Sequence, residues 1–200
     1  MDERLLKAKN IVFDIGNVLL RFRPEKVCTF FPEHMRSAMY EAMFMPDCGM
    51  SRWDMFDLGV PDNETIAKSM AEAAGFKEAK ETVLQFLEAF PGLMDEMPLY
   101  RMLPELKAMG KRIYALTNYP EPSFSRTLEL YPHLQLMDGV VVSSREKMKK
   151  PDERIFRLIA KRYAIVPEET LFIDDRADNI AAAARVGYKT WHYQIPTEML

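Results

Sequence analysis

The chain has 200 residues, of which 48% are hydrophobic and 28% are charged, and its formal net charge is −3. These values are ordinary for a folded globular protein, and the length suits one main core with an inserted module rather than two large independent domains. The slight negative charge gives no general attraction to phosphate backbones, so we expect no nucleic-acid partner.

The cysteines and the N-terminal segment bear on the compartment. Cys28 and Cys48 are too few for a disulfide framework, and neither belongs to a spaced Cys/His cluster that could hold zinc. The chain starts with acidic residues, and its first apolar run, residues 11–13, is interrupted by Asp14, which argues against a secretory signal. No apolar run approaches the ~18 residues that cross a membrane. By elimination we expect a cytoplasmic protein with no membrane partner.

Short, β-branched apolar runs recur along the chain and alternate with stretches of helical spacing. This alternation predicts an α/β fold, a Rossmann-like doubly wound parallel sheet. Three crossover helices are expected, one before Gly110, one with Pro151 at its first position and one before Gly187. The predicted strands are residues 11–14, 112–117, 139–143, 170–174 and 188–192, and the predicted crossover helices are residues 99–109, 151–163 and 177–186.

The segment between the first two strands is far longer than an ordinary crossover and contains no convincing strand. Helical spacing is visible in residues 33–44, 64–74 and 77–90. The sequence therefore predicts an all-helical cap over residues 22–97, inserted into a catalytic core that is formed by residues 1–21 and 98–200.

Polar residues end several predicted strands, at the edge where open α/β sheets collect their reactive groups. Asp14 ends the first strand and is followed by Gly16, but an Asp at this position could also be a turn cap. Thr117 and Asn118 end the second strand, where a hydroxyl and free N–H groups could bind an anion or belong to a plain turn. Neither motif alone decides between the two readings.

Two later motifs carry charge. Lys150 directly precedes a helix-starting proline, which favours an anion site, whereas Lys147 and Lys149 are interpreted as a solvated basic run. Asp174 and Asp175 end a buried strand side by side, and such adjacent acids are usually compensated by a hard divalent cation. Mg²⁺ fits this pattern. Asp178 and Asn179, a few residues further on, are assigned mainly to the start of the following helix.

Taken in this order, the four motifs resemble the signature motifs of the haloacid dehalogenase superfamily, from about residue 11 to residue 192. The resemblance implies that Asp14 is a catalytic nucleophile that forms an aspartyl-phosphate, assisted by Lys150. It further implies a phosphate site and a magnesium site. The implied phosphate-binding residues are Ile15, Gly16, Thr117, Asn118 and Lys150, and the implied Mg²⁺ ligands are Asp14, the carbonyl oxygen of Gly16, Asp175 and, through a water, Asp174.

The finer resemblance is to the branch that contains glucose-1-phosphate phosphatases and the phosphatase domain of soluble epoxide hydrolases. It depends on the run Asp14-Ile15-Gly16-Asn17-Val18 and on the pair Thr117-Asn118. It implies a Mg²⁺-dependent phosphatase of a small phosphorylated metabolite, such as a sugar 1-phosphate. We expect a monomer or a weak dimer.

The chain departs from the superfamily at Gly16, where its phosphatases usually carry an Asp that serves as general acid and base. Such a group is typically worth ~10²–10⁴ in rate. Three interpretations remain. The first is a phosphatase whose leaving group needs little protonation or takes its proton from another residue, such as Asp57 of the predicted cap. The second is a 2-haloacid dehalogenase, which the retained Asp174 and Asp175 disfavour, and the third is a non-catalytic phosphometabolite-binding protein, which the retained Asp14 disfavours.

Overall fold

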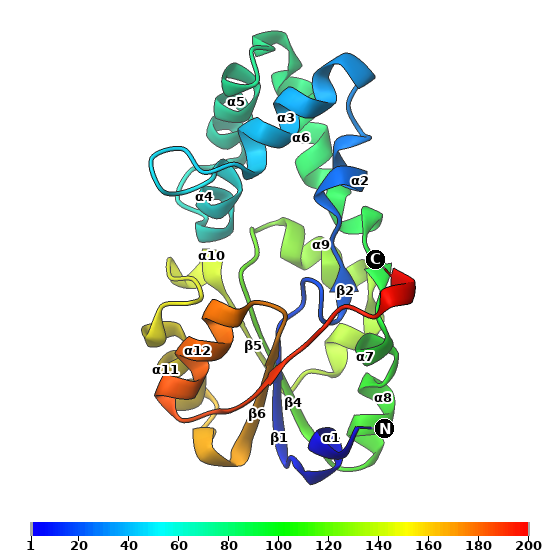
Figure 1. Ribbon diagram of the computed structural model, residues 1–200, viewed down its shortest axis with the longest axis vertical. Coiled ribbons are helices and arrows are strands. Elements are labelled where there is room, and N and C mark those ends of the chain that lie inside the picture. The colour runs from blue at the N-terminus through cyan, green and yellow to red at the C-terminus, as the bar shows by residue number, and fades with distance from the viewer. Residues whose placement is uncertain (1, 200) are drawn as a thin grey trace.

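The structure, a computed structural model, describes residues 2–199 apart from the side chains of residues 27 and 198. A parallel sheet with helices on both faces forms the lower part of the molecule in Figure 1, and a group of helices forms the upper part. The predicted α/β fold with a helical insertion is confirmed. No helix within residues 2–199 is long and apolar enough to cross a membrane.

The main sheet has five strands in the order β5-β4-β1-β6-β7, and all neighbours pair in parallel. β1 lies in the centre, and its last residue, Phe13, pairs with Ala115 of β4 and with Ile173 of β6. The residues that follow these three strands therefore meet at one edge. The strands are β1 Asn10–Phe13, β4 Arg112–Thr117, β5 Gly139–Val142, β6 Thr170–Asp174 and β7 Lys189–His192.

Both faces of the central strand are covered, which explains why its sequence is continuously apolar rather than alternating. Val12 packs in one buried cluster with Phe156 of α11 (Glu153–Arg162) and Ala182 of α12 (Ala177–Val186). Phe13 packs in the other cluster, together with Leu106 of α8 (Leu103–Ala108). The alternation of side chains along β1 thus divides the core into two layers.

Two of the three predicted crossover helices differ from the structure. The segment 99–109 is two helices, α7 (Pro98–Arg101) and α8, and Pro104 in the first turn of α8 has no N–H to continue the earlier helix. α11 begins after Pro151, because the side chain of Asp152 accepts a hydrogen bond from Arg154 N (2.9 Å) and acts as the N-cap. α12 is confirmed. The other elements of this part are α1 Glu3–Lys7, α9 Ser123–Leu130 and α10 Ser143–Glu146.

The insertion contains more helices than the sequence predicted. α4 (Arg52–Leu58) was missed, although Ser51 and Asp54 form a capping box at its start and Gly59 ends it in a left-handed conformation (φ 61°). The chain enters and leaves the insertion through a short antiparallel ribbon, β2 (Leu20–Arg21) with β3 (Asp95–Glu96). The boundaries at residues 22 and 97 stay a prediction. The remaining helices are α2 Pro24–Cys28, α3 Arg36–Phe44, α5 Asn63–Ala73 and α6 Lys80–Ala89, with short 3₁₀ turns at Glu33–Met35, Lys77–Ala79 and Phe90–Leu93.

Candidate active site

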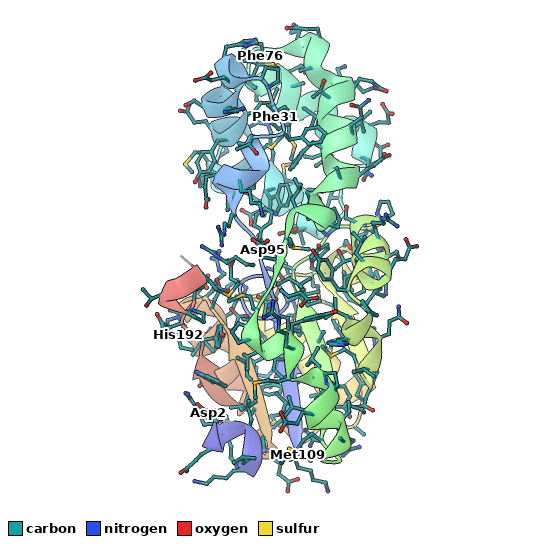
Figure 2. The ribbon with its side chains drawn as sticks, turned by 90° about the vertical axis from the view of Figure 1, so that its right-hand side faces the viewer. Asp2, Phe31, Phe76, Asp95, Met109 and His192 are labelled. Carbon is teal, nitrogen blue, oxygen red and sulfur yellow. The ribbon has the colours of Figure 1, made fainter. Side chains whose placement is uncertain are left out.

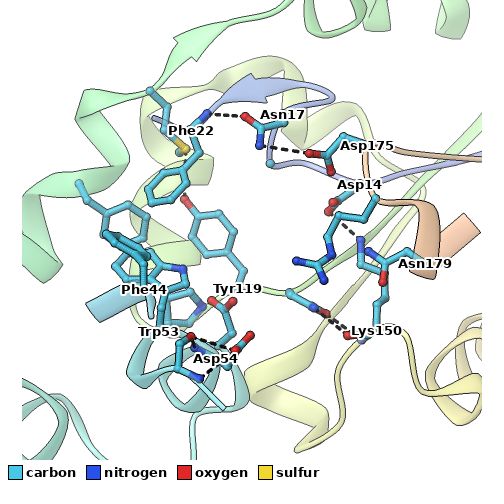
Figure 3. Close-up of a pocket in the computed structure, with 18 residues that line it drawn as sticks. Asp14, Asn17, Phe22, Phe44, Trp53, Asp54, Tyr119, Lys150, Asp175 and Asn179 are labelled. Atoms are coloured by element: carbon cyan, nitrogen blue, oxygen red, sulfur yellow. Dashed lines mark hydrogen bonds and ion pairs between the residues drawn. The ribbon is translucent and has the colours of Figure 1, made fainter. Parts of the chain in front are cut away.

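A cavity of about 340 Å³ lies where the carboxyl ends of the strands face the insertion. Figure 3 shows charged side chains on one side of it and aromatic rings on the other. The charged side consists of residues from the sheet part, including Asp14, Lys150 and Asp175. We call this the charged wall.

Three carboxylates converge at the charged wall. Asp14 follows β1, and Asp174 and Asp175 stand at the end of the adjacent β6, so the pairing of these strands brings them together. One oxygen of each lies within 4.8 Å of the others. Asp174 is fully buried and Asp14 is 8% exposed, so water does little to screen their mutual repulsion.

Lys150 lies between two of these acids. Its Nζ is 2.9 Å from Asp14 Oδ1 and 2.7 Å from Asp174 Oδ2, and the residue is 2% exposed. The side chain of Asn118 holds the lysine backbone from both sides, because Oδ1 accepts a hydrogen bond from Lys150 N (2.9 Å) and Nδ2 donates to Lys150 O (3.1 Å). The Asn118 side chain is therefore a positioning group for Lys150.

The pKa values follow from this burial. Burial raises the pKa of Asp14 to about 7, with Lys150 opposing and the two other acids adding to the rise. Burial and the charge of Asp174 also raise the pKa of Asp175. Burial acts to lower the pKa of Lys150, but the carboxylates of Asp14 and Asp174 outweigh it and raise that pKa. The single ammonium does not balance three carboxylates, and their all-oxygen donor set fits a hard divalent cation such as Mg²⁺.

Two asparagines that the sequence did not assign to the site orient its acids. Asn179 Nδ2 donates to both oxygens of Asp174 (3.0 and 3.1 Å), so its assignment mainly to the helix start was incomplete. Asn17 Nδ2 donates to Asp175 Oδ2 (3.2 Å) from a left-handed backbone position (φ 56°). An amide in the first turn of α12, facing back toward the strand, was the available signal for Asn179.

Of the other residues implied to bind phosphate, Gly16 and Asn118 line the cavity, Ile15 follows Asp14, and Thr117 ends β4, which pairs with β1. Thr117 is 1% exposed, and its Oγ1 has no hydrogen-bond partner among the described residues. Ile15 N donates to Asp14 Oδ1 (2.7 Å), while the Ile15 side chain is buried in the core, so only its backbone faces this group. Gly16 lines the cavity, and a Cβ at this position would meet no atom within 4 Å. An unpartnered buried hydroxyl is costly unless a ligand satisfies it.

Asp57 lies across the cavity, on α4 of the insertion. It is 8% exposed, and its carboxyl group makes no hydrogen bond to any residue that the structure describes. Burial raises its pKa to about 8, with Lys149 and Lys150 opposing and Asp54 and Asp14 adding to the rise. Asp57 is therefore mostly protonated at neutral pH.

Lys147 is exposed, as expected of a solvated residue, whereas Lys149 is only partly exposed, and both lysines contact the insertion. Lys149 Nζ pairs with Asp54 on α4, and Lys147 Nζ donates to the carbonyl of Gly59 at the end of this helix. Ser143 Oγ donates to the carbonyl of Asp57 (2.5 Å). These contacts join α4 to the segment that follows β5, and they fix Asp57 over the charged wall.

Comparison with known proteins agrees with this geometry. Residues 8–187 match the haloacid dehalogenase-like hydrolases, and the chain belongs to this family. Over 188 residues it is 26% identical to the sesquiterpene phosphatase astK of Aspergillus oryzae, covering 92% of this chain and 89% of the relative. Over 194 residues it is 26% identical to a D-ribitol-5-phosphate phosphatase of Bacteroides thetaiotaomicron, covering 92% and 90%.

A solved structure supports the fold. A haloacid dehalogenase family enzyme of Bacteroides thetaiotaomicron, in complex with magnesium and inorganic phosphate, has a TM-score of 0.77 to this chain at 21% identity. The match covers 94% of this chain and 95% of that one. The finer resemblance to the glucose-1-phosphate phosphatase branch stays a prediction, because these relatives carry other names.

Proposed function

We propose that this protein is a Mg²⁺-dependent phosphatase of a small phosphorylated metabolite and that Asp14 is its nucleophile. The observation that carries the proposal is the convergence of Asp14, Asp174 and Asp175 around Lys150; the neighbouring strand β4 ends in the Thr117 hydroxyl, which has no partner among the described residues. The two similar phosphatases and the magnesium and phosphate in the similar structure support it.

In the first step Asp14 attacks phosphorus, a P–O bond forms to its carboxylate, and the ester P–O bond breaks. Ile15 N and Lys150 Nζ both bind Oδ1, which leaves Oδ2 as the attacking atom. Lys150 and the hydroxyl of Thr117 hold the phosphoryl oxygens, together with the backbone of Asn118 and of residues 15–16. Water then attacks phosphorus and frees Asp14.

Mg²⁺ would be held by Asp14, the carbonyl oxygen of Gly16 and Asp175, with Asp174 acting through a water. When bound it would offset the charge of the carboxylates and of the phosphoryl group. Asn17 and Asn179 would keep the two acids of β6 oriented.

The leaving oxygen needs a proton that Gly16 cannot supply. We assign this role to Asp57, whose carboxyl group lines the same cavity, carries a proton at neutral pH and makes no competing hydrogen bond among the described residues. In the second step its carboxylate would take the proton of the attacking water. Residues 22–97 would thus act as a cap that completes the active site.

The proposal is tested by the turnover of p-nitrophenyl phosphate with Mg²⁺ and with EDTA. We expect Mg²⁺-dependent release of phosphate that Asp14→Asn abolishes. Asp62→Asn is the matched control, because Asp62 is an exposed N-cap on α5 and Asn caps a helix equally well. Full activity of Asp14→Asn, or release of halide from a 2-haloacid in EDTA, would contradict the proposal.

A further inference from the structure

The side of the cavity that faces the charged wall is made of aromatic carbon. We call it the aromatic wall, and it consists of Phe22, Phe44, Trp53, Phe90 and Tyr119. The rings of Phe22 and Trp53 are stacked at 5.2 Å, with Phe44 5.0 Å and Phe90 5.2 Å from Trp53. Figure 3 shows Phe22, Phe44, Trp53 and Tyr119 across the cavity from Asp14 and Lys150.

The aromatic wall is open to the cavity rather than sealed inside the core. Phe90 and Tyr119 are buried, but Phe22, Phe44 and Trp53 are only partly buried and form its accessible surface. Because Phe22, Phe44, Trp53 and Phe90 each contact two or more rings of the wall, and Tyr119 contacts Phe90 and the ring of Phe124 behind it, the wall is fixed in shape. It offers a preformed apolar surface to whatever group is attached to the phosphate.

Several polar groups around this surface are already paired, although the indole N–H of Trp53 has no hydrogen-bond partner among the described residues. Ser51 and Asp54 bind each other in the capping box, and Asp54 also pairs with Lys149. On the charged wall, the guanidinium of Arg176 pairs with Asp178. Among the described polar residues on the insertion side of the cavity, only Asp57 keeps a carboxyl group without a hydrogen bond.

A sugar or another polyol would therefore bind poorly here, because its hydroxyl groups would lose water and find few partners. An apolar group would gain from the same surface, by about fourfold in affinity for each methylene that leaves water. The geometry thus separates two classes of phosphate ester that the catalytic residues alone do not distinguish.

From this we infer that the substrate is the phosphate monoester of an apolar alcohol, with an alkyl, alkenyl or aryl group lying against the aromatic wall. The inference rests on the proposed phosphatase function and replaces the expected sugar 1-phosphate with a different substrate class. Trp53 and Phe44 become specificity-determining residues that act on the organic group and not on the phosphate.

A matched pair of esters tests this inference. Cyclohexylmethyl phosphate and glucose 6-phosphate both place a primary ester on a six-membered ring, so their leaving groups are similar and their polarity differs. We expect kcat/KM to be roughly tenfold or more higher for cyclohexylmethyl phosphate. Along ethyl, propyl, butyl and pentyl phosphate it should rise about fourfold per methylene until the cavity is filled.

Substitutions in the aromatic wall give a second test, the change in the ratio of kcat/KM for the two esters. Trp53→Ala and, separately, Phe44→Ala should each lower the cyclohexylmethyl-to-glucose ratio of kcat/KM by about tenfold or less, and the ratio does not depend on the fraction of folded enzyme. The control is Phe76→Ala, which removes a ring that contacts His34, does not line the cavity and lies at the end of the insertion away from the sheet part in Figure 2. It should leave the ratio unchanged.

The outcomes separate the two levels of the proposal. Asp14-dependent turnover with equal or higher kcat/KM on glucose 6-phosphate, or equal losses on both esters in Trp53→Ala, would overturn the inference and leave the phosphatase function standing. No Asp14-dependent turnover of either ester or of p-nitrophenyl phosphate would overturn the proposed function and the inference with it.

Discussion

The charged wall and the aromatic wall enclose one cavity but are built on opposite principles. The charged wall buries three carboxylates and an ammonium at strand ends, where burial, opposed by Lys150 and reinforced by the two other acids, raises the pKa of Asp14 to about 7. The aromatic wall buries carbon against carbon and stabilises the insertion by ordinary packing. The buried charged groups, which cost folding free energy, therefore lie on the sheet part, as expected of a catalytic site. The insertion contributes the apolar surface that shapes the cavity.

Asp57 is the exception that links the two walls. Its buried carboxyl group makes no hydrogen bond within the described part of the chain, and contacts of α4 with Ser143, Lys147 and Lys149 hold it in place. Because the charged wall holds buried charges, changes to it should affect both activity and stability. Changes at Asp57 should affect proton transfer and the pH dependence of stability, but not the binding of phosphate.

The largest expected effect is that of Lys150→Met. It leaves two buried carboxylates without their ammonium, which we expect to cost ~3–5 kcal/mol in unfolding free energy and about a thousandfold in kcat/KM. Urea unfolding and steady-state kinetics measure both. Lys161→Met, an exposed change on α11, is the control, and a Lys150→Met enzyme of normal stability would contradict the charged wall as described.

Asp57→Asn comes next. It removes the proposed proton donor, so kcat on an alkyl phosphate should fall by about a hundredfold, while kcat on p-nitrophenyl phosphate, whose leaving group needs little protonation, should change less than threefold or so. Equal losses on both esters would assign Asp57 a structural role instead.

The pH profile sharpens the same point. Because burial raises the pKa of Asp57 from 3.8 to about 8, its protonated form is lost as the pH rises through 8, and turnover of an alkyl phosphate should fall there. The same raised pKa contributes stability that is full below pH 3.8 and lost as the pH rises through about 8, so Asp57→Asn should become relatively more stable over this range. A wild-type profile without this alkaline limb would count against the assignment.

Thr117→Val should separate binding from stability. The hydroxyl is buried and unpartnered among the described residues, so its removal should leave the unfolding free energy unchanged or raise it by about 1 kcal/mol. The lost hydrogen bond to phosphate should raise KM by about tenfold. A clear loss of stability would mean that the hydroxyl has a partner within the protein.

The smallest effect is expected from Gly16→Asp. The backbone is unstrained at this position and nothing lies within 4 Å of a new Cβ, so the side chain fits. In the Asp57→Asn background it should restore kcat on an alkyl phosphate by about tenfold, since it returns an acid to the nucleophile's side of the cavity. No recovery in a folded double variant would show that an acid at residue 16 cannot reach the leaving oxygen.

Much of the charged wall was predictable from the sequence, because parallel strands bring their carboxyl ends to one edge and polar residues stand at those ends. Asp14, Thr117 and Asp174 lie where this rule places them. The side-chain role of Asn118 in holding Lys150 was not predicted, and the signal for Asn179, an amide in a first helical turn, was ambiguous, because such amides are equally typical of a turn or a cap.

The aromatic wall could not be predicted from the sequence, for a different reason. Phe22, Phe44 and Trp53 come from separate segments of the insertion, and only their packing decides which ring faces a cavity and which faces the core. The predicted helix boundaries were wrong at two places: Pro104 lies in the first turn of a separate helix, and Asp152 caps the start of α11.

The measurement that tests the central claim most directly is the detection of the phosphoryl-enzyme. Excess enzyme is mixed with an alkyl phosphate and Mg²⁺, quenched in acid within one turnover, and analysed by peptide mass spectrometry. We predict one added phosphoryl group on the peptide that contains Asp14, and none in Asp14→Asn. Turnover that proceeds with no phosphorylated Asp14, and that persists in Asp14→Asn, would contradict the account.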